Sequence, residues 1–196
     1  MKHNLYDSVA LLGTSADPPT TGHNALLIGL STIFSKVVTW ASSNPSKTHK
    51  ASLKQRLELL NALVQEISLP NIELKQELSS KWAITTLGMA TKYWPNTNLV
   101  LVIGSDLIQD IPNWVQAEDL IQKAHIGIVP RYGWPINQNE LNKIHQMGGQ
   151  TSLLQLDIPP SASSAIHKAT NVSQIPKAIL PILKRKQLYG FTQDNQ

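Results

Sequence analysis

Short apolar runs alternate with amphipathic segments along most of the chain. The runs are rich in β-branched and aliphatic residues and are bounded by polar or turn-forming residues, as is typical of buried strands in a parallel sheet. The expected strands cover residues 8–12, 36–41, 72–74, 99–103, 126–129 and 153–156. Apolar residues spaced three or four apart predict helices elsewhere. The expected helices cover residues 22–35, 52–67, 79–93, 114–123, 139–147 and 175–188, with another helical segment starting at 163.

Local signals predict where several helices begin or break. Ser52 and Gln55 have the Ser-x-x-Gln form of a capping box, in which each side chain satisfies a backbone N–H at the start of a helix. Ser79 is expected to cap the following helix, which Pro95 stops. Pro181 is expected to kink or break the last helix, because proline lacks the backbone N–H that a helix interior uses.

Strands that alternate with helices predict an α/β fold, a doubly wound parallel sheet with helices on both faces. A length of 196 residues suits one core, so we expect a single domain over 1–196. It divides into an α/β core over 1–160 and a small C-terminal helical segment over 161–196. Sheets of this kind bind ligands beyond the carboxyl ends of their strands, where we expect the functional residues to lie.

Composition excludes several function classes. The absence of cysteine excludes disulfides, thiolate nucleophiles and iron–sulfur clusters, and we expect a cytoplasmic protein. No apolar run approaches the roughly 18 residues of a membrane helix, so neither a secreted nor a membrane-spanning chain is expected. Residues 1–160 carry 12 basic and 12 acidic side chains, which leaves the formal charge of +4 to residues 161–196. Charge confined in this way favours anionic ligands at defined places over a general nucleic-acid surface.

The segment between the first strand and the first helix carries the candidate chemistry. It reads Gly13-Thr14-Ser15-Ala16-Asp17-Pro18-Pro19-Thr20-Thr21-Gly22-His23. A helix N-terminus offers backbone N–H groups and a partial positive charge, so it binds phosphate. Gly22 would let a ligand approach the backbone, and the Thr20 hydroxyl would reach the same anion. The His23 ring could donate to a phosphate whose charge redistributes during a reaction.

This segment resembles the (His/Thr)-x-Gly-His signature of the nucleotidyltransferase superfamily. The order of later motifs looks like that of bacterial nicotinate-nucleotide adenylyltransferases, and the resemblance runs from about Ala10 to Gly190. The later motifs are Lys47-Thr48-His49-Lys50, Arg56, Ile103-Gly104-Ser105-Asp106, Trp114 and Arg131. The resemblance implies a Rossmann-like fold and transfer of AMP from ATP to nicotinate mononucleotide, or to nicotinamide mononucleotide, with release of pyrophosphate. The chain would then act in NAD biosynthesis.

The resemblance also implies the partners and the cofactor of this reaction. They are ATP, a pyridine mononucleotide and Mg²⁺ bound through the ATP phosphates, with no metal site made by side chains, no nucleic acid and no membrane. The family forms no covalent enzyme intermediate, so catalysis rests on alignment of the substrates and neutralisation of their charge. Such an enzyme needs cations and hydrogen-bond donors rather than a nucleophile.

Roles follow for the residues on the matching motifs. His23 and Thr20 are expected to be catalytic. ATP binding is expected from Gly13, Thr14, Ser15, Gly22, His23, Gly104, Asp106, Ser164 and His167. Mononucleotide binding is expected from Lys47, His49, Lys50, Trp82, Trp114 and Arg131.

Four positions depart from the family pattern and leave alternatives open. Thr14 stands where the family commonly has a second glycine, and Ala16 where it commonly has phenylalanine. The family commonly places an arginine against the β- and γ-phosphates of ATP where this chain has His167, with Lys168 next to it. A tyrosine near the pyridine is replaced by Trp82. The alternatives are a nucleotide-binding paralogue without catalysis, and a nucleotidyltransferase that uses another phosphate acceptor.

Overall fold

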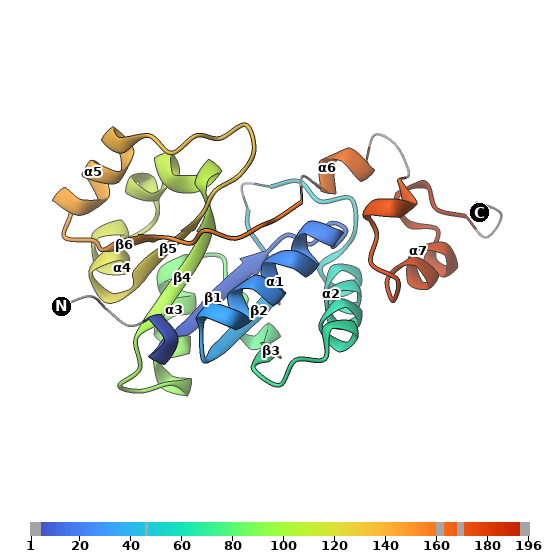
Figure 1. Cartoon of the computed structure of the whole chain (residues 1–196), viewed down its shortest axis with the longest axis horizontal. Helices are drawn as coiled ribbons and strands as arrows, with labels where there is room; N and C mark the ends of the chain where they lie inside the picture. The colour runs from blue at the N-terminus through green and yellow to red at the C-terminus, as the bar shows by residue number, and fades with distance from the viewer. Residues whose placement is uncertain (1–4, 46, 160–162, 168–170, 193–196) are drawn as a thin grey trace.

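A computed structural model describes residues 5–45, 47–159, 163–167 and 171–192 of the chain. Among these residues, six strands form one sheet in the order β3-β2-β1-β4-β5-β6, and every neighbouring pair is parallel (Figure 1). The strands are β1 (Val9–Thr14), β2 (Lys36–Ala41), β3 (Ile72–Leu74), β4 (Leu99–Gly104), β5 (His125–Val129) and β6 (Thr151–Leu153). The predicted doubly wound α/β fold is confirmed, with the strand order reversing between β1 and β4.

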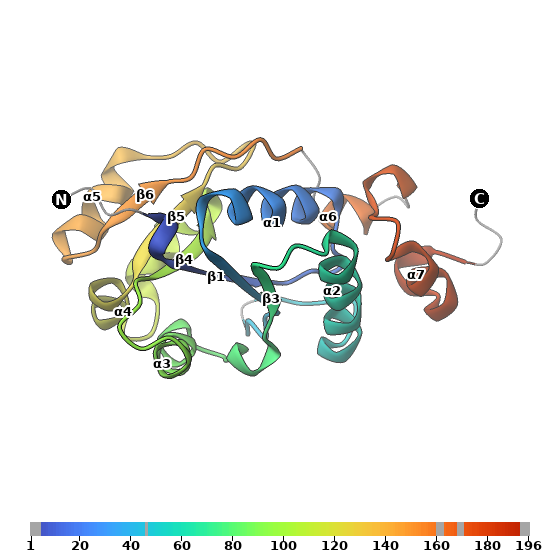
Figure 2. The same ribbon diagram turned by 60° about the horizontal axis from the view of Figure 1, so that its bottom comes forward.

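Helices cover both faces of the sheet, because successive strand residues point to opposite sides. Ala10 and Leu12 of β1 pack in a buried cluster with α1 and α2, whereas Val9 and Leu11 pack in a second cluster with α3, α4 and α5. Figure 2 shows α1 on one side of the sheet and α3 and α4 on the other. The helices are α1 (Thr21–Ile33), α2 (Leu53–Ile67), α3 (Ala83–Tyr93), α4 (Ala117–Lys123), α5 (Gln138–Gln146), α6 (Ser163–Ile166) and α7 (Leu180–Lys186).

The expected capping box starts α2 as predicted. The Ser52 backbone N–H donates to Oε1 of Gln55 over 2.9 Å, and the Gln55 N–H donates to the Ser52 hydroxyl over 3.3 Å. The last strand was expected at residues 153–156. In the structure it starts two residues earlier, because β6 pairs with β5 at Thr151–Leu153. Hydrogen-bond register with β5, which the side-chain pattern does not encode, sets that position.

Three expected helix boundaries were wrong. The Ser79 hydroxyl donates to the carbonyl of Ala41 over 3.0 Å instead of capping a helix, and α3 begins four residues later. Residues Ser105–Asn113 form a 3₁₀ helix, so α4 starts at Ala117 rather than Trp114. Pro181 lies in the first turn of α7, where its missing N–H costs no hydrogen bond, so it starts a helix rather than breaking one.

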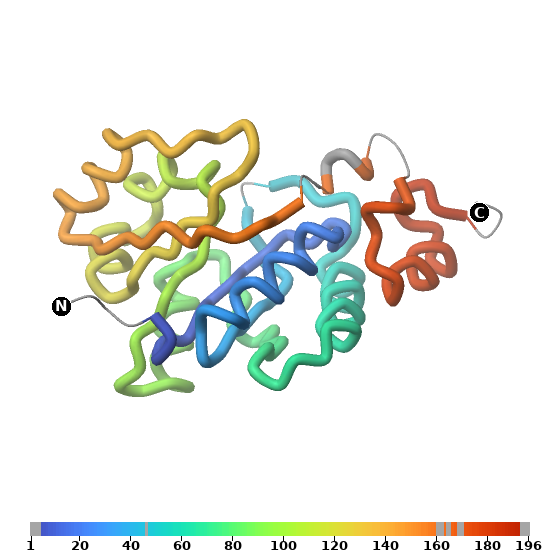
Figure 3. The backbone as a smooth tube through the Cα atoms, viewed as in Figure 1, coloured from blue at the N-terminus to red at the C-terminus, as the bar shows by residue number. Residues whose placement is uncertain are grey.

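The C-terminal segment lies beside α2 (Figures 1 and 3). Glu58 of α2 accepts hydrogen bonds from Arg185 over 3.2 Å and from Lys186 over 2.5 Å. Ile179 and Leu183 are buried in the same cluster as α1 and α2. None of the helices in the described ranges combines the length and the hydropathy that a membrane span requires.

Candidate active site

The candidate residues gather where the chain leaves the carboxyl ends of β1, β2, β4 and β5. From β1 the chain enters the loop 15–20 and then α1, on one face of the sheet. From β4 it enters the 3₁₀ helix at Ser105–Asn113, which packs with the cluster on the other face. This divergence at β1 and β4 is where doubly wound sheets form their ligand crevice.

His23 lies in the first turn of α1, and the hydrogen bond to its Nδ1 determines its tautomer. The Thr20 backbone N–H donates to Nδ1 over 3.1 Å, so Nδ1 is an acceptor and the proton of the neutral ring is on Nε2. The Thr20 hydroxyl lies 3.0 Å from the same nitrogen and is fully buried. No acidic residue occurs in this first turn, so the partial positive charge of the helix end is not offset there.

Two cations from other loops act on His23. Burial, followed by the charges of Arg131 and Lys47, lowers the pKa of His23 to about 4. The imidazole is therefore neutral at pH 7, and Nε2–H acts as a dipolar donor. The fold thus brings the charges of Lys47 and Arg131, which follow β2 and β5, close enough to act on His23, which follows β1.

Asp106 and Arg131 form an ion pair at the carboxyl ends of β4 and β5. The Arg131 guanidinium donates to Oδ2 of Asp106 over 2.8 Å. The other carboxylate oxygen, Oδ1, is buried and accepts no hydrogen bond from any described residue. A buried acceptor without a donor is costly, so Oδ1 is suited to a hydroxyl or N–H of a ligand.

Gly104 is required by this ion pair. A Cβ at Gly104 would lie 2.3 Å from Oδ1 of Asp106 and 2.7 Å from Cδ of Arg131. Ser105 positions the same region, because its hydroxyl donates to the Trp134 carbonyl over 2.7 Å and accepts from the Arg131 N–H over 2.9 Å. Ser105 therefore determines where the loop after β5 presents Arg131, a role that the sequence did not predict.

The basic loop after β2 contacts the loop after β1. Nε2 of His49 lies 3.3 Å from the Ser15 hydroxyl, and burial together with the Arg56 charge lowers the pKa of His49. Lys47 is exposed and its charge acts on His23, as described above. Lys50 instead points its ammonium at the backbone carbonyl of His167, 3.2 Å away. Of the three expected basic side chains, Lys50 is thus already bound to the C-terminal segment.

Asp17 and Arg56 hold these two loops together, and sequence reasoning assigned neither of them to the site. Oδ2 and Oδ1 of Asp17 accept hydrogen bonds from the N–H groups of Lys50 and Ala51, over 2.8 and 3.1 Å. The buried Arg56 side chain donates to the carbonyls of Ser15 and Ser42, over 2.7 and 2.9 Å. One signal was present in the sequence: a carboxylate in a loop expected to bind phosphate must turn away from the anion.

The other residues expected to bind ATP have varied surroundings, both in the segment 13–23, called the phosphate loop below after its expected ligand, and in α6. Gly13 faces Trp40, whose ring would lie 2.9 Å from a Cβ at that position, so packing on β2 requires the glycine. The Thr14 hydroxyl accepts from the Ala16 N–H over 3.3 Å and shapes the turn. Ser164 lies in α6, next to Ser163, whose hydroxyl donates to the Pro18 carbonyl over 2.8 Å. Lys168 lies outside the described residues.

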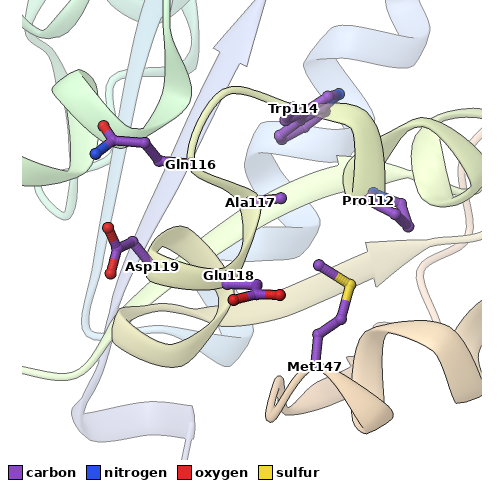
Figure 4. Close-up of a pocket in the computed structure, with 7 residues that line it drawn as sticks. All are labelled: Pro112, Trp114, Gln116, Ala117, Glu118, Asp119 and Met147. Atoms are coloured by element: carbon purple, nitrogen blue, oxygen red, sulfur yellow. The ribbon is translucent and has the colours of Figure 1, made fainter.

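The two tryptophans expected at the mononucleotide lie on other elements. Trp82 precedes α3, is 40% exposed and has the Lys81 ammonium 4.7 Å above its ring. Trp114 lines an open pocket of about 380 Å³ between the start of α4 and the end of α5 (Figure 4). Glu118 and Asp119 also line this pocket, and none of the phosphate-loop residues does. Acidic side chains disfavour a phosphate there, so at most the pyridine end of a mononucleotide suits this side of Trp114.

The described residues do not form a metal site of their own. They include no group of three or more histidine, aspartate or glutamate side chains that could hold a metal ion. Both carboxylates near the site are engaged, Asp17 by backbone N–H groups and Asp106 by Arg131. This donor set fits a divalent cation that is carried by phosphate oxygens and water.

Comparison with known proteins gives concordant results. Residues 11–176 match the model of the cytidylyltransferase-like family. A Synechocystis protein described as a probable nicotinate-nucleotide adenylyltransferase is 34% identical over 196 residues, covering 92% of this chain and 98% of that protein. A Listeria welshimeri protein with the same description is 24% identical and covers 97% of this chain and 99% of that protein.

Solved structures share the fold. The structure of Plasmodium falciparum nicotinic acid mononucleotide adenylyltransferase complexed with NaAD superposes with a TM-score of 0.75 at 21% identity. It covers 96% of this chain and 100% of that chain. The same enzyme complexed with APC gives a TM-score of 0.73, again at 21% identity and with the same coverage.

Proposed function

This chain belongs to the cytidylyltransferase-like family and is a nucleotidyltransferase; from that premise we propose that it joins AMP from ATP to nicotinate mononucleotide in NAD biosynthesis. The relative that shares 34% identity over almost its whole length carries the name of this activity. The reaction forms a bond between a phosphate oxygen of the mononucleotide and the α-phosphorus of ATP. The bond from that phosphorus to the β-phosphate oxygen breaks, and pyrophosphate leaves with the electron pair.

The observation that carries the proposal is the geometry of His23 at the start of α1. Nδ1 accepts from Thr20, which leaves the proton on Nε2, and the low pKa keeps the ring neutral. A neutral donor at a helix N-terminus stabilises negative charge that moves onto bridging and leaving oxygens during phosphoryl transfer. We assign His23 to the ATP phosphates, and Thr20 acts through His23 by holding its ring.

We assign ATP to the carboxyl ends of β1 and β4. Its phosphates meet Thr14, Ser15 and the backbone at Gly22, while exposed Gly13 allows close approach. The buried Oδ1 of Asp106 accepts from an adenosine ribose hydroxyl, beside the tight turn at Gly104. Ser163 and His167 contact the carbonyls of Pro18 and Asp17, so α6, which includes Ser164, lies next to the loop 15–20.

We assign the mononucleotide to the space between the loops after β2 and β5. Lys47 and Arg131 both place positive charge near His23, which suits the phosphate that attacks. His49 and Lys50 line the same loop, and Trp82 and Trp114 offer aromatic surface for the pyridine ring. Two bound substrates aligned in this way gain as much as ~7–11 kcal/mol of the barrier from proximity and orientation.

ATP reacts as a complex with a divalent cation, and we assign Mg²⁺ to it. The cation neutralises charge on the triphosphate, with its ligands drawn from phosphate oxygens and water because the described side chains supply no ligand set. The role left to this chain is to hold the triphosphate at the α1 N-terminus.

The test is pyrophosphate release measured acceptor by acceptor. The protein is incubated with ATP, Mg²⁺ and, in separate reactions, nicotinate mononucleotide, nicotinamide mononucleotide and other phosphate monoesters. We expect the highest kcat/KM with nicotinate mononucleotide. Tight ATP binding without pyrophosphate release from any acceptor would instead indicate a non-catalytic paralogue, and faster release with another monoester would reassign the acceptor.

A further inference from the structure

Tyr189 and Asp17 are 172 residues apart in the sequence and in direct contact in the structure. The Tyr189 hydroxyl donates to Oδ1 of Asp17 over 2.5 Å. Asp17 is only 4% exposed, and burial together with this hydrogen bond raises the pKa of Tyr189, so the hydroxyl keeps its proton. The phosphate loop is therefore tied to the last described turn of the chain.

His167 completes the contact. Its ring stacks on Tyr189 with centroids 5.4 Å apart and planes 8° from parallel. Its Nε2 lies 2.5 Å from the backbone carbonyl of Asp17 and 3.8 Å from the carboxylate. One nitrogen of His167 is thus engaged by the phosphate loop, at the position where related enzymes were expected to offer an arginine to ATP.

The backbone of Tyr189 shows that this contact is held in place. Tyr189 has φ 54° and ψ 29°, in the left-handed region that non-glycine residues rarely adopt. Such a conformation is strained and persists only where surrounding contacts determine it. The stack on His167 and the hydrogen bond to Asp17 contribute to this, together with packing of Tyr189 against the buried cluster of α1 and α2.

Asp17 passes this restraint on to the basic loop. The carboxylate that receives the Tyr189 hydroxyl also accepts the N–H groups of Lys50 and Ala51. If the carboxylate turns, the loop 15–20 and the loop 47–51 keep the link through Arg56 but lose the one through Asp17, and Lys47 and His49 are then less restrained relative to His23. Hydrogen bonds to a charged group are stronger than those between neutral groups, so this carboxylate can order the loop.

We propose that Tyr189 is a positioning residue: with His167 it fixes the Asp17 carboxylate, and so sets the spacing between the phosphate loop and the basic loop. The inference rests on the proposed function, since it deepens the account of how the two substrates are held. In this proposal His167 acts by holding the loop 15–20 in place, and it does not itself bind the ATP phosphates as a cation. Tyr189 itself contacts no substrate in this proposal.

The test is Tyr189→Phe, which keeps the ring and its stack on His167 and removes only the hydroxyl. We expect the backbone amides of Lys50 and Ala51 to exchange hydrogen about tenfold faster, because the carboxylate that accepts them has lost one hydrogen bond. NMR measures these exchange rates. We also expect the KM for nicotinate mononucleotide and the Kd for ATP to rise about five- to tenfold, with kcat at saturation within about twofold.

Tyr93→Phe is the matched control. Tyr93 lies on α3, is half exposed, and its hydroxyl makes no hydrogen bond to any described residue. The proposal is overturned if Tyr189→Phe and the control have equal exchange rates. It is also overturned if exchange is faster in Tyr189→Phe while KM and Kd are unchanged. If the wild-type protein releases no pyrophosphate with any acceptor, the proposed function fails by itself, and amide exchange with the Kd for ATP still decides the role of Tyr189.

Discussion

The backbone N–H of Thr20 donates to Nδ1 of His23, so the residue that precedes α1 determines which nitrogen of the catalytic candidate carries the proton. A ring held in this way cannot rotate to offer Nδ1, and Nε2–H is the only ring donor in the neutral form. Burial and the charges of Arg131 and Lys47 keep the ring neutral. The chemistry expected of His23 is therefore hydrogen-bond donation, without transfer of a proton.

Replacing His23 by alanine removes this donor. We expect His23→Ala to lower kcat/KM by about 10²–10³, the usual effect of deleting one oxyanion-stabilising donor. His145→Ala is the control, since His145 is an exposed residue whose Nε2 lies 2.9 Å from the Thr151 hydroxyl, on an element outside the candidate site. Steady-state pyrophosphate release measures both variants. A loss below tenfold in His23→Ala would remove His23 from the catalytic residues.

The lowered pKa of His23 also affects stability as a function of pH. The folded pKa is about 4 and the ordinary value is 6.5, so between these pH values the unfolded chain binds a proton that the folded chain does not. The contribution of His23 to the free energy of unfolding is therefore complete above pH 6.5 and falls as the pH drops toward 4. We expect a loss of up to about 2 kcal/mol at pH 5 relative to pH 7.

Denaturant unfolding of the wild type and of His23→Ala at pH 5, 6 and 7 isolates this contribution from that of other groups. The difference in the free energy of unfolding between the two proteins should change with pH in the direction just given. Parallel pH curves for the two proteins would show that His23 titrates near its ordinary value.

Gly104→Ala tests the ion pair between Asp106 and Arg131. The added methyl group would overlap Oδ1 of Asp106 and Cδ of Arg131, so both side chains must move. We expect the KM for ATP to rise about fivefold or more, since overpacking costs roughly 1–3 kcal/mol. Gly88→Ala is the control: nothing lies within 4 Å of its Cβ, and α3 should gain up to about 1 kcal/mol. An unchanged KM in Gly104→Ala would place the ribose elsewhere.

Arg56→Lys tests the link between the loops after β1 and β2. Arg56 is 3% exposed and donates to two carbonyls at once, which a lysine ammonium on a shorter side chain cannot do with the same geometry. We expect the free energy of unfolding to fall by about 2–4 kcal/mol, which lowers Tm by roughly 4–16 °C in a protein of this size. Calorimetry measures it. Lys54→Arg, at the exposed start of α2, is the matched surface control and should leave Tm within about 1 °C.

Removal of divalent cations tests how the metal is held. We expect EDTA to abolish pyrophosphate release while leaving the Tm of the substrate-free protein unchanged, because the described side chains form no metal site. Readdition of Mg²⁺ should restore turnover. A fall in Tm on chelation would reveal a metal bound by the protein itself.

Much of the fold could be predicted from the sequence because its signals are local. Apolar runs predicted β1, β2, β4 and β5 to within a residue or two, and the capping box predicted the start of α2 at Ser52. The candidate phosphate-binding segment could be proposed for the same reason, since its two glycines, its prolines and His23 lie within eleven consecutive residues. The start of α3 was wrong because the Ser79 hydroxyl bonds to Ala41 on a neighbouring strand.

The sequence by itself determined the type of fold, the family resemblance and the identity of His23, Asp106 and Arg131 as candidates, since periodicity and motifs are properties of neighbouring residues. Only the tertiary structure decided that Arg131 pairs with Asp106, that Lys50 and His167 meet, and that Tyr189 reaches Asp17. These contacts join segments between 25 and 172 residues apart. Hydrogen bonds of this kind depend on distance and direction in space, which the parallel sheet sets by bringing the carboxyl ends of its strands to one edge.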